Sequence, residues 1–469
     1  MPRPIQVVLF VYVVPLTSCR NTFGGSRYPM FIVDLLLVLI IVFLVYATVV
    51  GSFGLWNSSK GKDRHSPTSR FAVLVPAHDE EAVIEPLLES LGDQEYPGDL
   101  YDIYVIADNC SDSTADRARS AGAEVMERTS RDARGKGHAL RYGLEQLDLL
   151  GPEASGAYDA VVFFDADNLV DPSFLQVMND RLLSGEDLIQ AFLDSKNPAD
   201  TWISSAYSLL FWLNCRYMML ARYNLGLSAA FMGTGMCISA AALADVGWNV
   251  ETLTEDLEYS AQAVLKGYPT HYTHETRVYD EKPLTFAASA KQRLRWARGQ
   301  FAVAFGYLIP LISSGIKNRC PVRLEAGARL CQLFVILAAS PVFWLHSHLG
   351  GGENWGMAGA MLDGIPFFPQ ILVVVPYSIM VYAAVVDGHP AETYVYAPLY
   401  PVFTFSWLFI MLAGLFTVGN KRWMPTEHRR ALDMARINRP RILTVSPRDV
   451  AQYETRIAMA GGFSGTNWN

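Results

Sequence analysis

The chain has long apolar blocks near both ends and a region of alternating short apolar and polar stretches between them. Residues 31–50 form an apolar run with a single charged side chain, Asp34, and are long enough to cross a bilayer core of about 30 Å as a helix. From residue 70 to about residue 183, apolar runs of strand length alternate with helix-like stretches. The predicted strands are Phe71–Pro76, Ile103–Ala107, Ala123–Glu127 and Ala160–Phe164, and the predicted helices include Glu80–Leu91 and Lys136–Leu149. This alternation predicts right-handed crossovers and a mostly parallel α/β sheet, close to a Rossmann arrangement.

Three further apolar segments follow the central region, at residues 326–344, 366–386 and 397–418. The first two are long enough to be membrane spans. If all three crossed, the basic C-terminal tail would lie on the side opposite the central region, against the positive-inside tendency. We therefore expect residues 397–418 not to cross, since two prolines interrupt the start of this segment. Residues 301–312 are also apolar, but they are few and include Pro310, so we expect them at the membrane interface.

The first 29 residues allow several interpretations. Ile5–Leu16 is apolar but too short to span a bilayer, and Leu16-Thr17-Ser18-Cys19 superficially resembles a lipoprotein cleavage box. A cleaved signal directly before a second hydrophobic span would be unusual, and Met30 lies where a shorter natural start would be. Residues 1–29 are therefore an N-terminal extension that is native, cleaved or lipidated.

Composition and charge narrow the class of protein. At 469 residues the chain exceeds the usual size of one domain. Apolar residues make up 51% and charged residues 18%, which indicates a soluble domain joined to membrane segments rather than a polytopic transporter. The net charge of −8 and the lack of a nucleic-acid-binding motif argue against a nucleic-acid partner. The six cysteines show no CxxC pairing, which indicates neither a zinc site nor a disulfide framework and fits a reducing cytosol.

Several carboxylates directly follow apolar runs, where a parallel sheet places the working residues of a nucleotide site. Asp79 follows the first predicted strand and Asp108 the second. Asp165 and Asp167 follow the last predicted strand, and a hard divalent cation is usually held by one or two carboxylates together with substrate phosphates. We therefore predict Asp167 as a ligand of Mg²⁺ or Mn²⁺, with Asp165 as a second acid at the metal. Taken singly, Asp79 and Asp108 are also explained by a capped helix start and an Asx-type turn.

A later segment carries a different combination of side chains. Gln292, Arg295 and Trp296 stand at i, i+3 and i+4, so they share one face if the segment is helical. An amide, a guanidinium and an indole together suit recognition of a diphosphate beside a flat platform for a sugar ring. The alternative is an amphipathic surface helix with an aromatic side chain in the bilayer interface. Lys136 lies between two glycines, in a turn that either approaches a phosphate or is a solvated loop.

Together these segments resemble the membrane-embedded family-2 glycosyltransferases, the processive group that contains cellulose, chitin and hyaluronan synthases. The resemblance covers roughly residues 70–300 and rests on Asp79, Asp108, Asp165-Ala166-Asp167, Thr254-Glu255-Asp256 and Gln292-Arg293-Leu294-Arg295-Trp296. It implies an α/β fold of the GT-A (Rossmann-like) type, with α-helical transmembrane and interfacial segments attached. Beside Asp108, Ala107 and Asn109 replace the acid and the glycine that are usual in the family.

The resemblance also implies roles for individual residues. Nucleotide-sugar binding is assigned to His78, Asp79, Glu80, Asp108, Lys136, Asp165, Gln292 and Arg295. Asp256 is assigned as the general base that takes the proton from the acceptor hydroxyl, and metal binding falls to Asp167 and Asp165. The acceptor would contact Glu255, Trp296 and the glycine-bearing turn at Gly235, although Ile238-Ser239-Ala240 replaces an arginine pair found there in many relatives. Trp423–His428 loosely resembles the mobile loop of cellulose synthases, or is an interfacial tryptophan followed by a basic tail.

The expected organisation follows from these segments. It comprises an extension at 1–29, a transmembrane helix at 30–56, a cytosolic GT-A domain at 65–284, interfacial helices at 285–320, C-terminal transmembrane and interfacial helices at 325–420, and a basic cytosolic tail at 421–469. The basic excess after the first apolar helix favours a cytoplasmic catalytic domain. We therefore expect a multi-pass protein of the plasma (inner) membrane, in contact with the lipid bilayer.

The function implied is an inverting, processive transferase that polymerises a β-linked polysaccharide from a UDP-sugar and moves the growing polysaccharide through the membrane, with or without a partner subunit. An alternative keeps the chemistry and transfers one sugar to a polyprenyl phosphate or another lipid. An alternative of a different class is a catalytically inactive membrane scaffold for a glycan synthase. The scaffold requires the loss of a key carboxylate, and Asp108, Asp165, Asp167 and Asp256 are all present.

Overall fold

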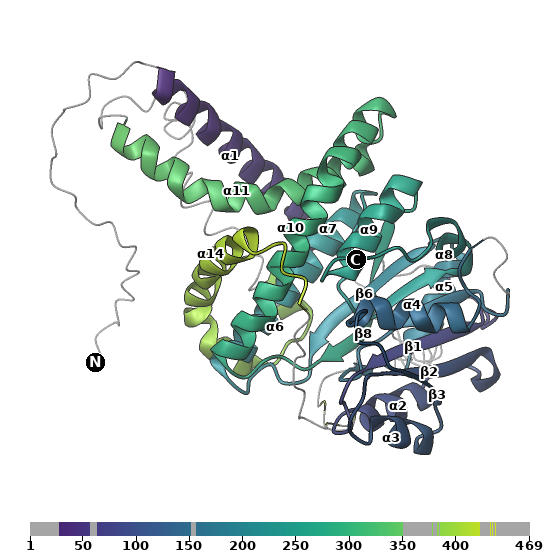
Figure 1. Cartoon of the computed structure of the whole chain (residues 1–469). Helices are drawn as coiled ribbons and strands as arrows, with labels where there is room; N and C mark the ends of the chain where they lie inside the picture. Colours follow the sequence, from purple (N-terminus) through teal and green to yellow (C-terminus); the bar gives the residue numbers. More distant parts are fainter. Residues whose placement is uncertain are drawn as a thin grey trace, which may run out of the picture.

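The computed structural model describes residues 28–56, 63–151, 156–349, 382–383 and 385–422, together with single positions at 378, 432, 434 and 437. Its centre is one eight-stranded sheet in the order β3-β2-β1-β4-β7-β6-β8-β5 (Figure 1). The strands are β1 (Phe71–Ala77), β2 (Tyr101–Asp108), β3 (Glu124–Arg128), β4 (Ala160–Phe163), β5 (Leu169–Val170), β6 (Leu188–Ser195), β7 (Met236–Ser239) and β8 (Thr270–Asp280).

The sheet is parallel in its first half and mixed in its second. Strands β3, β2, β1 and β4 run parallel, which confirms the predicted arrangement and the four predicted strands. The short strand β7 runs antiparallel between β4 and β6, while β6 and β8 pair in parallel. The carboxyl ends of β1, β2 and β4 therefore meet at one edge, as a nucleotide crevice requires.

Alternate residues of the strands belong to two separate cores. Phe71, Val73 and Val75 pack in one core, while Ala72 and Leu74 pack in the other, since successive side chains of a strand point to opposite faces. The first core includes side chains of α2, α5 and α6, and the second includes side chains of α4, α8 and α9. The sheet is thus covered by helices on both faces, the architecture expected for buried parallel strands.

The helices have the following bounds: α1 (Tyr28–Ser52), η1 (Phe53–Leu55), α2 (Ile84–Gly92), η2 (Gly98–Leu100), α3 (Thr114–Ser120), α4 (Lys136–Gln146), α5 (Phe174–Leu183), α6 (Trp202–Leu213), the π-helix η3 (Asn214–Leu220), α7 (Ala221–Asn224), α8 (Ala240–Val246), α9 (Glu255–Lys266), α10 (Phe286–Lys317), α11 (Pro321–Leu349), η4 (Ala391–Leu399) and α14 (Tyr400–Phe416). The predicted helices at 80–91 and 136–149 correspond to α2 and α4. Both predictions are confirmed apart from their ends.

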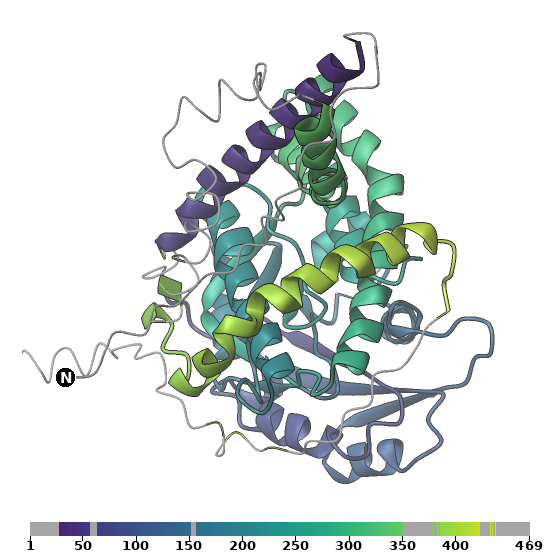
Figure 2. The same ribbon diagram turned by 90° about the vertical axis from the view of Figure 1, so that its left-hand side faces the viewer.

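Long helices gather beside the sheet domain. Helices α1 and α11 run side by side and project away from it, packed through Val33, Leu37, Ile40, Ile41 and Val342 (Figures 1 and 2). Within the described residues, three helical stretches are long and apolar enough to cross a membrane: Ile32–Leu55, Phe286–Lys317 and Ala391–Phe416. The first agrees with the span predicted at 31–50. Helix α11, where we expected a span at 326–344, is not among the three.

The structure corrects the extent of one predicted segment and leaves others outside its scope. The short apolar stretch at 301–312 is the middle of α10, a helix of 32 residues that continues through Pro310. Packing of α10 against α9, α11 and α14 supplies the contacts that offset the hydrogen bond lost at this proline. The described residues leave out most of the apolar segment at 366–386, nearly all of the tail from residue 423 and nearly all of the N-terminal extension.

Helix α10 is fastened to α14 by a buried arginine. The Arg293 side chain is fully buried, and its Nη1 donates a hydrogen bond to Ser406 Oγ at 2.8 Å. Its guanidinium also lies 4.3 Å from the centroid of the Phe403 ring, a favourable cation–π distance. Arg293 therefore holds two helices together and points away from the neighbouring residues Gln292 and Arg295.

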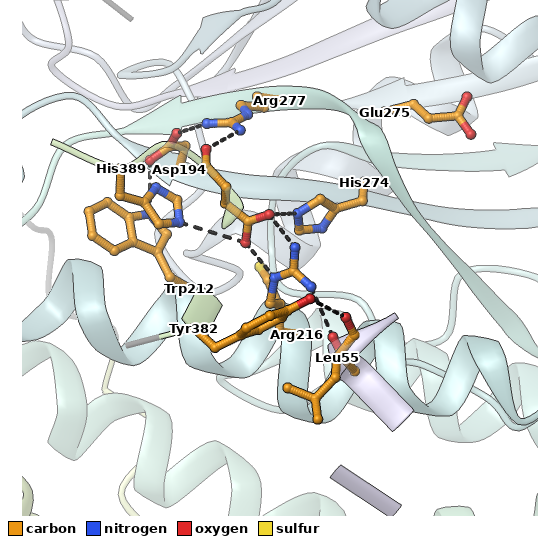
Figure 3. A network of polar contacts seen from close by, with 12 residues as sticks. Leu55, Asp194, Trp212, Arg216, His274, Glu275, Arg277, Tyr382 and His389 are labelled. Carbon is orange, nitrogen blue, oxygen red and sulfur yellow. Dashed lines mark hydrogen bonds and ion pairs between the residues drawn. The ribbon is translucent and has the colours of Figure 1, made fainter. Parts of the chain in front are cut away.

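A second buried polar cluster joins three segments that are far apart in the sequence (Figure 3). The Asp387 carboxylate pairs through both oxygens with Arg216 of η3 and lies 2.9 Å from His274 Nε2 of β8. Arg216 Nη1 donates to Gly54 O at 3.0 Å, and Arg277 Nη2 donates to Asp387 O at 2.9 Å. The end of the first apolar helix, the π-helix and the segment before η4 are thus tied to the sheet.

We expect Asp387→Asn to lower the midpoint of thermal unfolding of the detergent-solubilised protein, because Arg216 would remain buried without its counter-charge. Breaking a buried pair in this way typically costs about 3–5 kcal/mol. The matched control is Glu85→Gln, which breaks the exposed pair between Glu85 and Arg117 (3.2 Å) and should change stability by less than about 1 kcal/mol. Equal midpoints for the two variants would contradict the structural role of Asp387.

Candidate active site

A cavity of about 720 Å³ begins at the carboxyl ends of β1, β2 and β4 and continues between α6, η3, α10, α11 and α14. Its wall contains side chains that are distant in the sequence. The predicted site residues that line it are His78, Glu80, Asp108, Lys136, Asp165, Asp167, Glu255, Asp256, Gln292, Arg295 and Trp296. Two predicted site residues, Asp79 and Gly235, are not part of the lining.

Asp79 holds two loops together. It is exposed and has a positive φ of 55°, and its Oδ1 accepts a hydrogen bond from Ser111 N at 2.6 Å. The neighbouring His78 Nδ1 lies 2.7 Å from Asp108 O. Asp79 therefore orders the loops after β1 and β2, while His78 and Glu80 reach the cavity. The sequence pattern alone does not distinguish these neighbours, because all three follow the same strand.

Asp108 is paired with a cation that we did not predict. Arg128, at the end of β3, lies 2.5 Å from Asp108 Oδ1, and both side chains are largely buried. Asn109 Nδ2 donates to the same oxygen at 2.8 Å. Arg128 thus neutralises the acid at this end of the cavity. Because β2 and β3 are neighbours only in the folded sheet, residue spacing carried no signal for the pair.

Lys136 connects the first half of the site with the second. Its Nζ donates to Asp165 Oδ1 at 2.5 Å and to Gly233 O at 2.6 Å, and it lies 3.8 Å from Glu255 Oε1. Burial alone would lower the pKa of Lys136, but Asp165 and Glu255 outweigh it and raise the pKa, so the ammonium stays charged. Lys136 therefore supplies a buried positive charge beside the strand-end carboxylates.

Gly233 permits a close approach in this region. Its φ is +92°, and a Cβ there would lie 3.6 Å from Asp256 Oδ2 and 4.0 Å from Lys136 Nζ. Asp256, Lys136 and Asp165 are consequently grouped around one turn. Gly235, which we had assigned to the acceptor, instead packs inside the sheet, where a Cβ would meet Val278 Cγ2 at 2.9 Å. The glycine beside the cavity is Gly233, and Gly235 is required for the tight approach of β8.

A group of acids surrounds the end of β4. Asp167 is buried, and its Oδ2 accepts a hydrogen bond from Glu281 N at 3.1 Å. Asp280, at the end of β8, also lines the cavity. Burial raises the pKa of Asp280 to about 6; Lys282 opposes this rise, while Asp167 and Asp165 add to it. Asp280 and Glu281 were missed because no motif marks the end of β8.

The donor set at this point fits a hard divalent cation. Asp165, Asp167 and Asp280 offer only oxygen ligands, the type that Mg²⁺ and Mn²⁺ prefer. Burial is the main cause of the raised pKa of Asp280, and Asp167 and Asp165 add to it; a cation bound among the three acids would relieve their mutual repulsion. The three acids fit a site that is completed by phosphate oxygens of a bound nucleotide.

Among the residues that the structure describes, the group whose ligand atoms all lie within 4.8 Å of one another is a different one, formed by Asp79, Cys110 and Asp112. Its carboxylates already accept hydrogen bonds, Asp79 from Ser111 and Asp112 from Thr114. Burial raises the pKa of Cys110 to about 11, so the thiol stays protonated and is a poor ligand. We therefore assign no metal to this group.

Asp256 lies in the first turn of α9, facing the cavity. Its Oδ1 accepts a hydrogen bond from Leu257 N at 2.8 Å. Burial raises the pKa of Asp256 to about 7, and the adjacent Glu255 adds to the rise, while Lys136 and Arg295 oppose it. A carboxyl with a pKa near neutrality has the property required of a general base or acid.

The predicted helical face is present on α10. Gln292, Arg295 and Trp296 all line the cavity, while Arg293 points to α14. The Trp296 ring packs against Tyr207 and Phe211, with ring centroids 6.0 and 5.9 Å away. In the part of the chain that the structure covers, Arg295 has no hydrogen bond or ion pair, although its charge acts on Asp256. Arg295 is therefore available to an anionic ligand.

Away from the sheet, the cavity becomes mainly apolar. The π-helix η3 contributes Met218 and Met219, α11 contributes Leu330, Leu333 and Ile336, and α14 contributes Trp407 and Met411. Arg329 of α11 also lines this end. These residues were not predicted, because only tertiary packing turns one face of each helix toward the cavity. The loop predicted at 423–428 lies outside the described residues.

Comparison with known proteins finds a family model that matches the sheet domain. Residues 67–299 match the model described as "Glycosyltransferase like family 2". This match and the strand order identify a GT-A-like, Rossmann-type glycosyltransferase fold with an open curled sheet. A structural neighbour is mannosyltransferase PcManGT from Pyrobaculum calidifontis, solved with GDP-Man and Mn²⁺. It is 17% identical, with a TM-score of 0.48, over 76% of this chain and 98% of that chain.

Two proteins of similar sequence have names that state what they synthesise. Beta-monoglucosyldiacylglycerol synthase of Trichormus variabilis is 30% identical over 49% of this chain and 48% of its own length. The UDP-forming cellulose synthase 1 catalytic subunit of Komagataeibacter xylinus is 26% identical over 58% of this chain and 36% of its own length. The chain spans about half the length of several curated relatives that it matches.

The raised pKa of Asp256 predicts a specific dependence of stability on pH. The folded state holds the proton more tightly than the unfolded state, whose carboxyl has a pKa of about 3.8. Stability therefore falls as the pH rises from about 4 to about 7. Asp256→Asn stays neutral, so it should unfold at a higher temperature than the wild type at pH 8 and at a similar temperature at pH 4.

The control is Asp245→Asn, which alters an acid paired with Lys266 on the surface and should show no such difference between the two pH values. Thermal unfolding of the detergent-solubilised proteins at pH 4 and pH 8 supplies the measurement. If Asp256→Asn changed the midpoint equally at both pH values, Asp256 would not titrate in this range.

Proposed function

We propose, on the premise that residues 67–299 are a domain of glycosyltransferase family 2, that the protein transfers a hexose from a UDP-sugar to an acceptor hydroxyl with inversion. The observation that carries this proposal is the single cavity shared by Asp256, Arg295, Trp296 and the strand-end acids. A UDP donor is supported by the UDP-forming cellulose synthase among the relatives. An α-linked donor would give a β-linked product, because one in-line displacement inverts the anomeric centre.

The donor end of the site consists of the strand-end residues and the cations near them. His78, Glu80 and Asp108 would contact the nucleoside, and Lys136 lies beside the acids that follow β4. Asp167, with Asp165 or Asp280, would hold Mg²⁺ or Mn²⁺. When bound, this cation would stabilise the negative charge that develops on the departing diphosphate. Arg295, with Gln292 beside it on α10, would bind the same diphosphate from the opposite wall.

Asp256 would act at the bond that forms. The acceptor oxygen attacks the anomeric carbon, the bond from that carbon to the diphosphate oxygen breaks, and the acceptor proton passes to Asp256. The pKa near 7 and the position next to Gly233 support this role, since a base must be exposed to the substrate and unprotonated at neutral pH. Glu255, which is buried 3.8 Å from Lys136, would maintain the charge balance around the base rather than bind the acceptor directly.

Two acceptors fit the cavity. A growing β-linked polysaccharide is supported by Trp296, whose indole offers a platform on which a sugar ring stacks at the start of the helical end of the cavity. A lipid that receives one sugar is supported by the apolar side chains of η3, α11 and α14. A catalytically inactive scaffold is the weakest reading, because Asp108, Asp165, Asp167 and Asp256 are all present around one cavity.

Membrane association is supported by the three apolar helices and by the diacylglycerol-glucosylating relative. We propose a multi-pass protein of the plasma (inner) membrane with its catalytic domain in the cytoplasm. In this arrangement a UDP-sugar made in the cytosol would reach the sheet end of the cavity directly, while an acceptor would enter from the side of α11 and α14.

We expect Asp256→Asn to reduce UDP release by about 10²- to 10⁴-fold, the usual contribution of a general base. The wild-type rate should rise as the pH increases through about 7, because Asp256 must lose its proton. The assay is UDP release from purified membranes supplied with a panel of UDP-sugars and Mg²⁺ or Mn²⁺. Glu251→Gln, which alters an exposed acid near the start of α9, is the control and should leave the rate unchanged. Full activity of Asp256→Asn would exclude this mechanism.

The product distinguishes the two acceptors. With a radiolabelled UDP-sugar, a processive enzyme should give a long product that stays at the origin of a thin-layer plate and is sensitive to a β-glycanase. A lipid glycosyltransferase should give an organic-soluble product that carries one sugar. Exclusive formation of the one-sugar product would exclude processive synthesis.

A further inference from the structure

The apolar end of the cavity contains one guanidinium. Arg329 lies on the same face of α11 as Gln332, Leu333 and Ile336, and all four line the cavity, as residues three, four and seven positions apart should. The facing wall includes Met218 and Met219 of η3. A single cation is thus placed among mainly apolar side chains, in a segment whose composition led us to expect a membrane span.

The carboxylate nearest in sequence to Arg329, that of Glu325, forms an ion pair with a different arginine, Arg222. Glu325, one turn before Arg329, has its Oε1 2.8 Å from Arg222 Nε and also accepts a hydrogen bond from Tyr46 at 3.2 Å. Arg329 donates through Nη1 to Ser228 O at 3.0 Å, while its Nε is buried without a hydrogen-bond partner. No carboxylate within the described ranges lies close enough to form an ion pair with Arg329. Two arginines therefore share one acid, and one positive charge remains.

This excess charge has an energetic cost unless an anion meets it. Arg329 is half-buried with its Nε out of contact with solvent, and a guanidinium that loses hydration without a counter-ion gains too little from one carbonyl contact. Charged side chains inside apolar helical regions commonly mark the path of a ligand. The donor diphosphate is already matched by Arg295 and Lys136 at the sheet end of the cavity, so the charge of Arg329 suits a second anionic group.

We propose that Arg329 binds the phosphate of an anionic lipid, which is the acceptor or carries it. The acyl or prenyl chain would lie along Leu330, Leu333 and Ile336, and a hydroxyl-bearing headgroup would extend from the phosphate toward Trp296 and Asp256. The combination of an unpaired cation and apolar walls selects a lipid phosphate over free phosphate, which needs no apolar wall, and over a neutral glycan, which needs no cation. This proposal rests on the transferase function proposed above and specifies its acceptor class.

Direct binding tests this assignment independently of turnover. The full-length protein in a neutral detergent is titrated with lysophosphatidylglycerol, with monoacylglycerol of the same chain and with glycerol phosphate. Lysophosphatidylglycerol carries both an acyl chain and a phosphate. Monoacylglycerol carries only the acyl chain, and glycerol phosphate carries only the phosphate. We expect lysophosphatidylglycerol to bind at least about tenfold more tightly than either of the others, as a charge-assisted contact predicts. Arg329→Gln should remove this preference, and Arg329→Lys should retain part of it.

Lys317→Ala is the matched control, since it removes a positive charge from the exposed end of α10 and should change no affinity. UDP binding measured on each variant checks that the sheet end of the cavity is intact, so a misfolded variant is recognised. Equal affinity of lysophosphatidylglycerol and monoacylglycerol, or an unchanged preference in Arg329→Gln with UDP binding intact, would overturn the proposal. Tight glycerol phosphate binding would indicate a site for free phosphate instead and would also overturn it.

The two proposals fail in different ways. If no UDP-sugar is turned over with any acceptor while lysophosphatidylglycerol binding still depends on Arg329, the transferase function fails and the lipid site stands. If UDP release is rapid but binding is indifferent to Arg329, the lipid assignment fails and the transferase function stands.

Discussion

The structure depends on the attachment of α10 to α14 by the buried Arg293. The guanidinium lies against the Phe403 ring and donates to Ser406, so the two helices are held at a fixed separation. The neighbouring residues of α10, Gln292, Arg295 and Trp296, consequently face the cavity rather than α14. On α14, Trp407 and Met411 form part of the same cavity wall. One interaction thus positions both the face of α10 that carries Gln292, Arg295 and Trp296 and the part of the cavity wall that α14 contributes.

Charge compensation is the second constraint on the site. The strand ends bring several acids together. Two of them form ion pairs, Asp108 with Arg128 and Asp165 with Lys136. Asp256 and Asp280 have pKa values raised toward neutrality by burial and by neighbouring acids. The paired acids already have a counter-charge in the fold, whereas the acids with raised pKa values respond to a proton or a cation. The cavity therefore contains acids that are already paired with a cation and acids whose negative charge is not fully compensated.

The cavity combines two environments that suit different parts of one reaction. At the sheet it is polar and charged, which suits a nucleotide diphosphate. Between η3, α11 and α14 it is mainly apolar and includes Arg329, which has no ion pair among the described residues. A sugar transferred from a water-soluble donor to a membrane-bound acceptor must cross such a boundary. Trp296 lines the same cavity, and its indole is compatible with both environments.

The sequence by itself determined the features that depend on local order. Strand-length apolar runs identified β1 to β4, and the i, i+3, i+4 spacing correctly grouped Gln292, Arg295 and Trp296, because both patterns follow from the geometry of one element. The acids after β1, β2 and β4 were found for a related reason: parallel strands bring their carboxyl ends to one edge. Tertiary structure alone decided which side chain of each loop reaches the cavity.

Asp79 turns to Ser111 while His78 and Glu80 line the cavity, and Gly233 rather than Gly235 adjoins Asp256. Asp280, Arg128 and Arg329 enter the site from a mixed-sheet strand, an edge strand and a distant helix, where no motif marks them. Their roles arise from contacts across many residues of sequence. Such contacts are determined by packing and charge balance in the folded chain, which residue spacing does not encode.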